Sequence, residues 1–393
     1  MTLKEELRLY ENDVIEIRHE LHRRAEIPNH EFRTTEFIRE KLTEFGIEIR
    51  ELPLRTGACA LINGGRPGPT IALRADIDAL PIVEDTGLDF ASEQEGASHS
   101  CGHDLHAAAL LGAARYLQTH REELAGNVWL FFQPAEESLD GAKQMIAAGC
   151  LQQEPIPENI LSCHTTTLAP TGKYSMARGA YTSSCDSVRI TIRGEGGHGA
   201  YPHRYGDPIT AAASLLMQLQ TCVSRENNAM YPAVLSFGSI HGGAAPNVVP
   251  DKVELLGTLR AVREESRTVI KKAIQRITEH TCAALRTTAE VEFFGAAVSP
   301  VINDAKTVER VENAIRTLFG QEAMEYMDVP AAGSEDFSEY LKYCPGAQIR
   351  FGTRTEEDPA TAFGGHTPQV RYDDKSLFYA TALFCQYVVD YLK

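Results

Sequence analysis

Two hydrophobic patterns alternate along the first half of the chain. Helical spacing of apolar residues extends over residues 14–42, with an interruption at Pro28, and returns over residues 105–117 and 141–148. Short apolar runs at residues 70–74 and 127–132 predict buried strands. Strands that alternate with helices predict an α/β domain with a mostly parallel sheet, covered by helices on both faces. In such a sheet, functional residues gather beyond the carboxyl ends of the strands.

The pattern changes near Asp186. Residues 187–193 alternate between apolar and polar, which predicts a strand with one solvated face. A helix is predicted at residues 208–225, strands at 233–240 and 252–261, a helix at 264–285 and a strand at 289–294. This order is that of a ferredoxin-like α+β domain with an antiparallel sheet. Because the α/β pattern returns from Pro300, we expect residues 1–185 and 299–393 to form a catalytic domain and residues 186–298 an inserted lid or dimerisation domain.

Composition narrows the class of protein. A chain of 393 residues is long enough for two domains. The net charge of -16, with no basic patch, argues against nucleic acid or an anionic membrane as partners. Residues 1–20 are charged and lack the apolar core of a signal peptide, and no run of about 20 apolar residues predicts a membrane span. Nine cysteines without a paired framework favour reduced thiols and a cytoplasmic location.

Cys101 and His103 are the strongest chemical signal. A thiolate and an imidazole two positions apart suit zinc and other late divalent metals. A structural zinc site would need a second Cys or His pair of similar spacing, and none lies nearby. The site therefore needs distant ligands, for which Glu137, His164 and His366 are candidates. Histidines are more often structural, by roughly three to one, but His164 follows a strand-like run and His366 follows two glycines.

Three further positions carry candidate chemistry. Glu136, beside Glu137, is a candidate general base, although an acidic surface turn would look the same. Asp78, with Asp76, follows a predicted strand and would ligate or orient a histidine, although an Asp-rich turn is the simpler interpretation. His198, in a glycine-rich loop of the insert, would donate to a developing oxyanion.

Taken together, these motifs closely resemble the zinc aminoacylase/carboxypeptidase superfamily of metallo-amidohydrolases. The nearer match is its branch of hippurate hydrolases, indole-acetyl-amino-acid hydrolases and N-acetyl-diaminopimelate deacetylases. The resemblance covers essentially the whole chain. It rests on ordered motifs at residues 21–26, 73–81, 100–104, 132–137, 197–203, 247–251, 333–337 and 366–368.

The resemblance implies two divalent metal ions per subunit (Zn, Mn, Ni or Co), bridged by Cys101. His103 and His164 would complete the ligands of one ion, and Glu137 and His366 those of the other. It implies that Glu136 is the catalytic base and that Asp78 lies behind the metal ligands. It also implies that His198 and Asn247 reach the substrate, often across a homodimer or higher homo-oligomer formed through the lid domain.

The predicted activity is hydrolysis of the amide bond of N-acyl amino acids, with N-acetyl, benzoyl or similar acyl groups. A dipeptidase or carboxypeptidase on the same scaffold is the alternative, which Cys101 disfavours because those relatives usually bridge the metals with a carboxylate. A non-catalytic protein that binds amino-acid derivatives would have lost a ligand or the base, and all are present. Residues 165–167 are three threonines, unlike the family pattern, so the pocket wall and the substrate preference are expected to differ.

Overall fold

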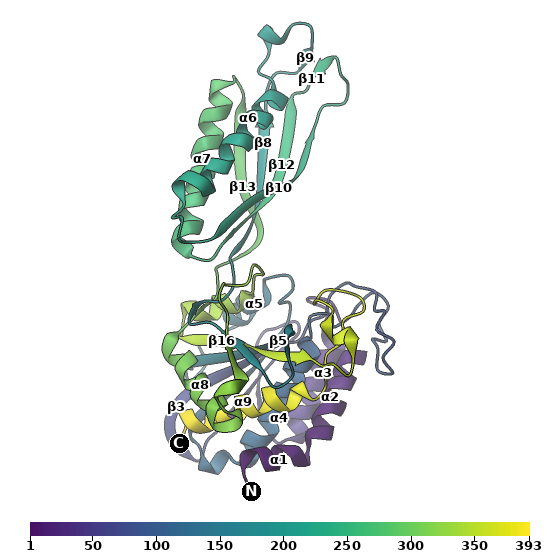
Figure 1. Ribbon diagram of the computed structural model, residues 1–393, viewed down its shortest axis with the longest axis vertical. Helices are drawn as coiled ribbons and strands as arrows, with labels where there is room; N and C mark the ends of the chain where they lie inside the picture. The colour runs from purple at the N-terminus through teal and green to yellow at the C-terminus, as the bar shows by residue number, and fades with distance from the viewer. The chain divides into compact units, whose positions relative to one another are not determined.

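A sheet of eight strands forms the centre of the first of two units in this computed structural model, which describes residues 1–393 (Figure 1). The first unit comprises Met1–Tyr181, Ile302–Val329 and Asp336–Lys393. The second unit comprises Thr182–Val301 and Pro330–Glu335.

The strands of the large sheet follow the order β1-β2-β4-β3-β5-β16-β6-β15. Their bounds are Glu48–Arg50 (β1), Ala58–Asn63 (β2), Arg66–Asp76 (β3), Ala125–Gln133 (β4), Asn159–Pro170 (β5), Tyr174–Met176 (β6), Met324–Tyr326 (β15) and Gly346–Arg354 (β16). The four central strands β4, β3, β5 and β16 are parallel, whereas β1 and β2 join one edge in antiparallel pairing. The central strands are apolar because both faces are covered.

Helices cover the two faces unequally. On one face α4 (His103–Thr119) packs against β3, β5, α2 (Glu11–Arg23) and α9 (Ser376–Tyr391). The remaining helices of this unit are α1 (Leu3–Leu9), α3 (Phe32–Glu44), α5 (Gly141–Ala147) and α8 (Ala305–Phe319), with short 3-10 turns η1 (Arg121–Glu123), η4 (Gln321–Ala323), η5 (Asp336–Lys342) and η6 (Pro359–Ala362). On the other face α5 and η5 pack together, and Tyr340 of η5 stacks on Phe131 of β4. The predicted α/β domain is confirmed.

The strand ends position the chemistry-bearing residues, as the sequence predicted. β3 ends at Asp76, and β4 ends three residues before Glu136. His164 lies within β5, and α4 begins at His103. A short two-stranded pair, β7 (Gly179–Ala180) with β14 (Ile302–Asn303), lies where the chain leaves and re-enters this unit.

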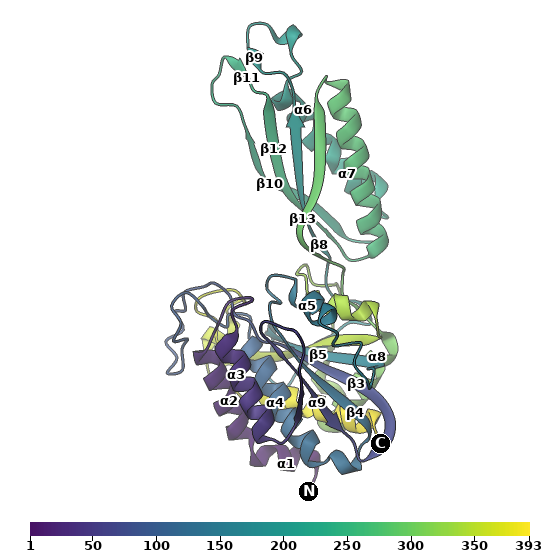
Figure 2. The same cartoon turned by 180° about the vertical axis from the view of Figure 1, so that it is seen from behind.

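The second unit has the β-α-β-β-α-β order of a ferredoxin-like fold. Its strands β8 (Cys185–Arg193), β10 (Ala233–Gly242), β12 (Lys252–Ala261) and β13 (Thr288–Val298) form an antiparallel sheet in the order β10-β12-β8-β13. Helices α6 (Pro208–Thr221), continued by a π-helical turn η3 (Cys222–Glu226), and α7 (Glu264–Ala284) pack on one face (Figure 2). Their apolar residues meet Val188, Ile190 and Ile192 of β8 in a separate core.

A small ribbon extends from the second unit. Its strands β9 (Gly197–His198) and β11 (Val248–Val249) pair antiparallel. The short turn η2 (Pro202–Arg204) follows β9 in the chain. None of the helices in either unit is long and apolar enough to cross a membrane.

Candidate metal centre

Cys101 lies at the centre of the predicted ligand set, in the turn that precedes α4. Gly102 has a left-handed φ of 81°, and a Cβ atom there would come within 2.9 Å of the Thr165 side chain. The turn therefore requires glycine. The Sγ atom of Cys101 lies 3.6 Å from Nε2 of His164. Together with His103, these side chains offer three ligand atoms that all lie within 4.8 Å of one another.

A second group shares Cys101. Nε2 of His366 lies 3.4 Å from Sγ of Cys101 and 3.5 Å from Oε1 of Glu137, and the three ligand atoms lie within 4.8 Å of one another. The backbone N–H of His366 donates to the carbonyl of Ser100, over 2.8 Å, which holds this loop beside the Cys101 turn. The five predicted ligands thus come together in two groups that have Cys101 in common.

The geometry and the polar groups of the cluster fit divalent cations. Nε2 of His103 and Oε1 of Glu137 are buried, have no hydrogen-bond partner, and lie 3.7 Å apart. Ligand atoms held around one ion with tetrahedral zinc geometry are separated by about 3.4 to 3.6 Å, close to the distances in this cluster. An unsatisfied buried polar atom costs roughly 1 to 3 kcal/mol, and a bound cation would remove that cost.

The electrostatics of the cluster also favour a cation. Burial, followed by the Glu137 carboxylate, raises the pKa of the Cys101 thiol well above its usual value. Burial opposes a charge on His103, but Asp76 and Cys101 outweigh it and raise the pKa of His103 well above its usual value. Burial and the neighbouring His106 lower the pKa of His164, which keeps that imidazole neutral and able to ligate. Metal binding at this cluster would therefore displace protons.

Asp78 orients two of the ligands. Nδ1 of His103 donates to the carbonyl of Asp78 over 2.9 Å and to its Oδ1 atom over 3.2 Å, which turns Nε2 toward Cys101 and Glu137. The backbone N–H of Glu137 donates to Oδ2 of the same carboxylate over 2.9 Å. A carboxylate behind a ligating histidine fixes its tautomer and orientation.

Glu136 lies beside the cluster of candidate ligands. Its Oε2 atom is 4.0 Å from Nε2 of His103, and the residue is only 5% exposed. The preceding Ala135 has a φ of 54° and donates its N–H to Glu31 over 2.8 Å. Glu31 in turn accepts the hydroxyl proton of Thr56 over 2.7 Å. The buried carboxylate of Glu31 therefore holds the strained turn at Ala135, which directs Glu136 and Glu137 toward the cluster.

Asp76 and His106 belong to the same region but are already paired. Nδ1 of His106 donates to Oδ1 of Asp76 over 2.5 Å, and Nε2 of His106 accepts from the N–H of Thr165 over 2.8 Å. Both ring nitrogens are used, so His106 is a structural histidine that fixes β5 beside α4 rather than a free ligand. Sequence reasoning missed this pair, although the position of His106, one turn after His103 on a helix, was a signal.

In the loop motif at residues 333–337, Asp336 has a structural role. Asp336 is fully buried and accepts hydrogen bonds from Arg74 over 3.1 Å, from Gln133 over 2.8 Å and from the N–H of Ala142 over 2.8 Å. Arg74 also pairs with Asp76 over 2.6 Å. One carboxylate thereby ties together β3, β4 and α5 behind the site.

His198 and Asn247 belong to the second unit, whereas the five candidate ligands belong to the first. His198 is exposed in β9, and its Nδ1 accepts the N–H of Ala200 over 3.1 Å. Gly199 donates its N–H to the carbonyl of Asn247 over 2.8 Å. The ribbon of β9 and β11 therefore holds these two predicted substrate-binding residues next to each other.

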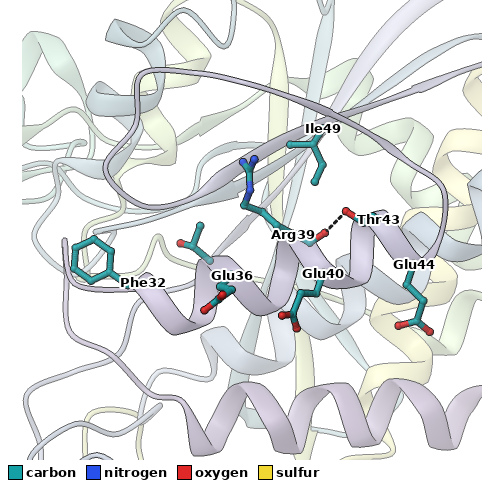
Figure 3. Close-up of a pocket in the computed structure, with 8 residues that line it drawn as sticks. Phe32, Glu36, Arg39, Glu40, Thr43, Glu44 and Ile49 are labelled. Atoms are coloured by element: carbon teal, nitrogen blue, oxygen red, sulfur yellow. Dashed lines mark hydrogen bonds between the residues drawn. The ribbon is translucent and has the colours of Figure 1, made fainter.

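Two of the cavities in the first unit differ in character. One, of about 290 Å³, includes Cys101 and His164 in its lining and opens the ligand cluster to solvent. Another, of about 780 Å³, lies over the outer surface of α3, where acidic side chains face solvent (Figure 3). Its lining includes Arg39, whose carbonyl accepts the hydroxyl proton of Thr43 over 2.8 Å. It contains none of the ligands, so only the smaller cavity bears on the chemistry.

Comparison with known proteins agrees with the fold. Residues 72–390 match the family described as peptidase family M20/M25/M40. N-acetyl-L-cysteine deacetylase of Bacillus subtilis is 38% identical over 387 residues, covering 97% of this chain and 90% of that protein. Thermostable carboxypeptidase 1 of Saccharolobus solfataricus is 34% identical, covering 90% of this chain and 89% of that protein. A crystal structure from Bacillus subtilis, of a dinuclear metal binding peptidase from the M20 family, has a TM-score of 0.85 at 33% identity and covers 98% of this chain and 99% of that one.

The fold and the clustered candidate ligands indicate a metal-dependent hydrolase. The chain belongs to peptidase family M20/M25/M40. This membership confirms the resemblance found in the sequence, together with the predicted fold and the class of metal-dependent amidohydrolase.

Proposed function

We propose that this protein hydrolyses N-acyl amino acids to a carboxylic acid and a free amino acid. The observation that carries the proposal is the position of Glu136 beside two ligand groups that share Cys101. The similarity to a relative named as an N-acetyl-L-cysteine deacetylase supports an acylated amino acid as the substrate class.

In the proposed site, two divalent cations, drawn from Zn, Mn, Ni or Co, would be held by two ligand groups that have Cys101 in common. His103 and His164 complete one ligand group, and Glu137 and His366 the other. The bound cations would supply Lewis-acid activation of water and of the scissile carbonyl. The cysteine ligand favours soft, late divalent metals over Mg and Ca.

The residues of the chain then handle the proton. Glu136 accepts a proton from the attacking water and returns it to the nitrogen of the leaving amino acid, so that one water is added across one amide bond. Asp78 keeps His103 in the tautomer whose Nε2 faces the cluster. Burial of Glu136 excludes bulk water from this exchange.

For the second unit, we propose that His198 stabilises the oxyanion and that Asn247 contacts the substrate, in a homodimer formed through this unit. Exposure of His198 on a hydrogen-bonded ribbon supports a role toward a ligand rather than in a core.

A panel of substrates tests the proposal. Metal-loaded protein is incubated with N-acetyl amino acids, N-benzoyl amino acids and unblocked dipeptides, and the free amine released is measured. Turnover of the acylated amino acids, absent in Glu136→Gln, is the expected result. A carboxypeptidase or dipeptidase, the second candidate because of the relative with that name, would release amine from peptides instead. No turnover of any acylated amino acid would refute the proposal.

A further inference from the structure

The cavity beside the ligand cluster has one permanently charged side chain. Its lining comprises Cys101, His164, Thr165, Thr166, Thr167, Leu168, Arg350, Gly364, Gly365 and Tyr372. Arg350 is the only member that is charged at all pH values at which proteins fold, and no carboxylate lines the cavity. This local positive charge contrasts with the net charge of the whole chain, which is -16.

The backbone fixes Arg350 next to the ligand cluster. Arg350 of β16 is the register partner of His164 of the neighbouring parallel strand β5. Adjacent strands are about 4.8 Å apart, and side chains at paired positions lie on the same face of the sheet. The Arg350 side chain therefore extends from the backbone position next to that of His164, a proposed metal ligand.

Arg350 has no acidic partner. Its guanidinium carbon lies 5.4 Å from the ring centroid of Tyr181, a contact that positions the side chain but leaves its charge unneutralised. The side chain is half-buried and forms no ion pair, whereas the buried arginines Arg18 and Arg74 each pair with two carboxylates. A half-buried guanidinium without a counter-charge is suited to bind an anion supplied by a ligand.

The threonines add neutral hydrogen-bonding groups. The Thr165 hydroxyl donates to the carbonyl of Cys101 over 2.9 Å, and the Thr166 hydroxyl accepts from the N–H of Leu168 over 3.3 Å. The Thr167 side chain lines the same cavity and has no hydrogen bond of this kind within the chain. These hydroxyls form a polar wall beside Arg350.

We infer that Arg350 binds a carboxylate of the substrate, with Thr167 as a neutral hydrogen-bonding neighbour, and so selects substrates that carry a negative charge beside the scissile amide. This inference rests on the proposed function. The carboxylate comes from the amino acid or from the acyl group, and the two sources are separable by experiment.

The test compares three amides. N-acetyl-L-methionine has a carboxylate on the amino acid, N-succinyl-L-methioninamide has one on the acyl group, and N-acetyl-L-methioninamide has none. For the parent, kcat/KM is expected to be at least roughly tenfold higher on one charged substrate than on the neutral one, as a charge-assisted hydrogen bond implies. Arg350→Ala removes this preference and Arg350→Lys keeps part of it, because lysine retains the charge but not the planar fork.

Arg354→Ala is the matched control, because Arg354 is exposed at the end of the same strand and does not line the cavity. It should leave all three values unchanged. An Arg350→Ala variant that keeps the preference, or that loses activity equally on charged and neutral substrates, would overturn the inference. The better charged substrate identifies which carboxylate is bound.

A binding measurement separates this inference from the proposed function. Calorimetry with metal-loaded Glu136→Gln protein and the same three ligands needs no turnover. Roughly tenfold or greater weakening of carboxylate-ligand binding by Arg350→Ala is expected even if none of the amides is hydrolysed by the parent. Equal affinity with and without Arg350, or no binding of either charged ligand, would overturn the inference.

Discussion

The Asp78→Asn substitution tests whether the carboxylate of Asp78 orients two of the proposed ligands. It keeps the size of the side chain and changes its hydrogen-bonding groups. Asp78 accepts two donors at once, Nδ1–H of His103 on Oδ1 and the N–H of Glu137 on Oδ2. Asparagine has the same size but offers one carbonyl oxygen and one NH₂ group. Whichever way the amide turns, one of the two N–H donors must face another donor.

The expected loss is in metal affinity. Removing a carboxylate behind a ligating histidine typically costs 10- to 100-fold in metal affinity or activity, which is about 1.4 to 2.7 kcal/mol. Competition with a chelator of known affinity measures this directly. Asp89→Asn is the control, because Asp89 is exposed in the same segment of the chain. Metal affinity within twofold of the parent in Asp78→Asn would refute the argument that Asp78 orients the ligands.

Further predictions concern the shared thiolate and the second unit. Cys101→Ser should lower metal content and activity together, because an alcohol is a much poorer anionic bridge; full metal content by elemental analysis would contradict this. Asp186→Asn should destabilise the second unit by about 3 kcal/mol, since its buried carboxylate pairs with Arg267 over 2.6 Å. Hydrogen exchange in β8 measures this loss, and unchanged protection there would count against it. Mixing inactive Glu136→Gln and inactive His198→Ala chains should restore about a quarter of the sites if His198 acts across a dimer; no recovery, with subunit exchange verified by mass spectrometry, would exclude that arrangement.

The Asp186 prediction includes a dependence on pH. Burial alone would raise the pKa of Asp186, but hydrogen bonds from Arg267 and Lys271 outweigh it, so the pKa is lowered from its ordinary value. A carboxyl whose pKa is lower in the folded state stabilises the fold above its unfolded pKa of about 3.9. The parent should therefore lose this contribution as the pH falls below about 4, and the Asn variant should show no such loss.

Hydrophobic periodicity predicted much of the fold because the two units differ in the period of their patterns. Apolar runs placed β3 and β4, and strict alternation placed β8. The break between α1 and α2 at Tyr10 was not predicted, since the seven residues of α1, with a single buried leucine, carry little periodic signal. The association of Pro330–Glu335 with the second unit depends on contacts such as Arg260 with the carbonyl of Ala332, which no local pattern encodes.

The candidate site was predictable where residue type alone limits the chemistry. A thiol near an imidazole and two adjacent carboxylates suggested Cys101, His103, Glu136 and Glu137 as functional. The partners behind them, apart from Asp78, were not predictable, because a buried aspartate that accepts several hydrogen bonds looks in sequence like any turn residue. Asp336 is such a case: its donors Arg74, Gln133 and Ala142 lie 262, 203 and 194 residues from it along the chain, and only the fold brings them together.

Glu136→Gln measures the central claim most directly. The substitution removes a proton acceptor and leaves every proposed ligand in place, so metal content and kcat are recorded on the same preparation. We predict a loss of turnover on the order of 10²- to 10⁴-fold with both metals retained. Activity on N-acyl amino acids within a few-fold of the parent, at full metal content, would contradict the assignment of Glu136 as the base.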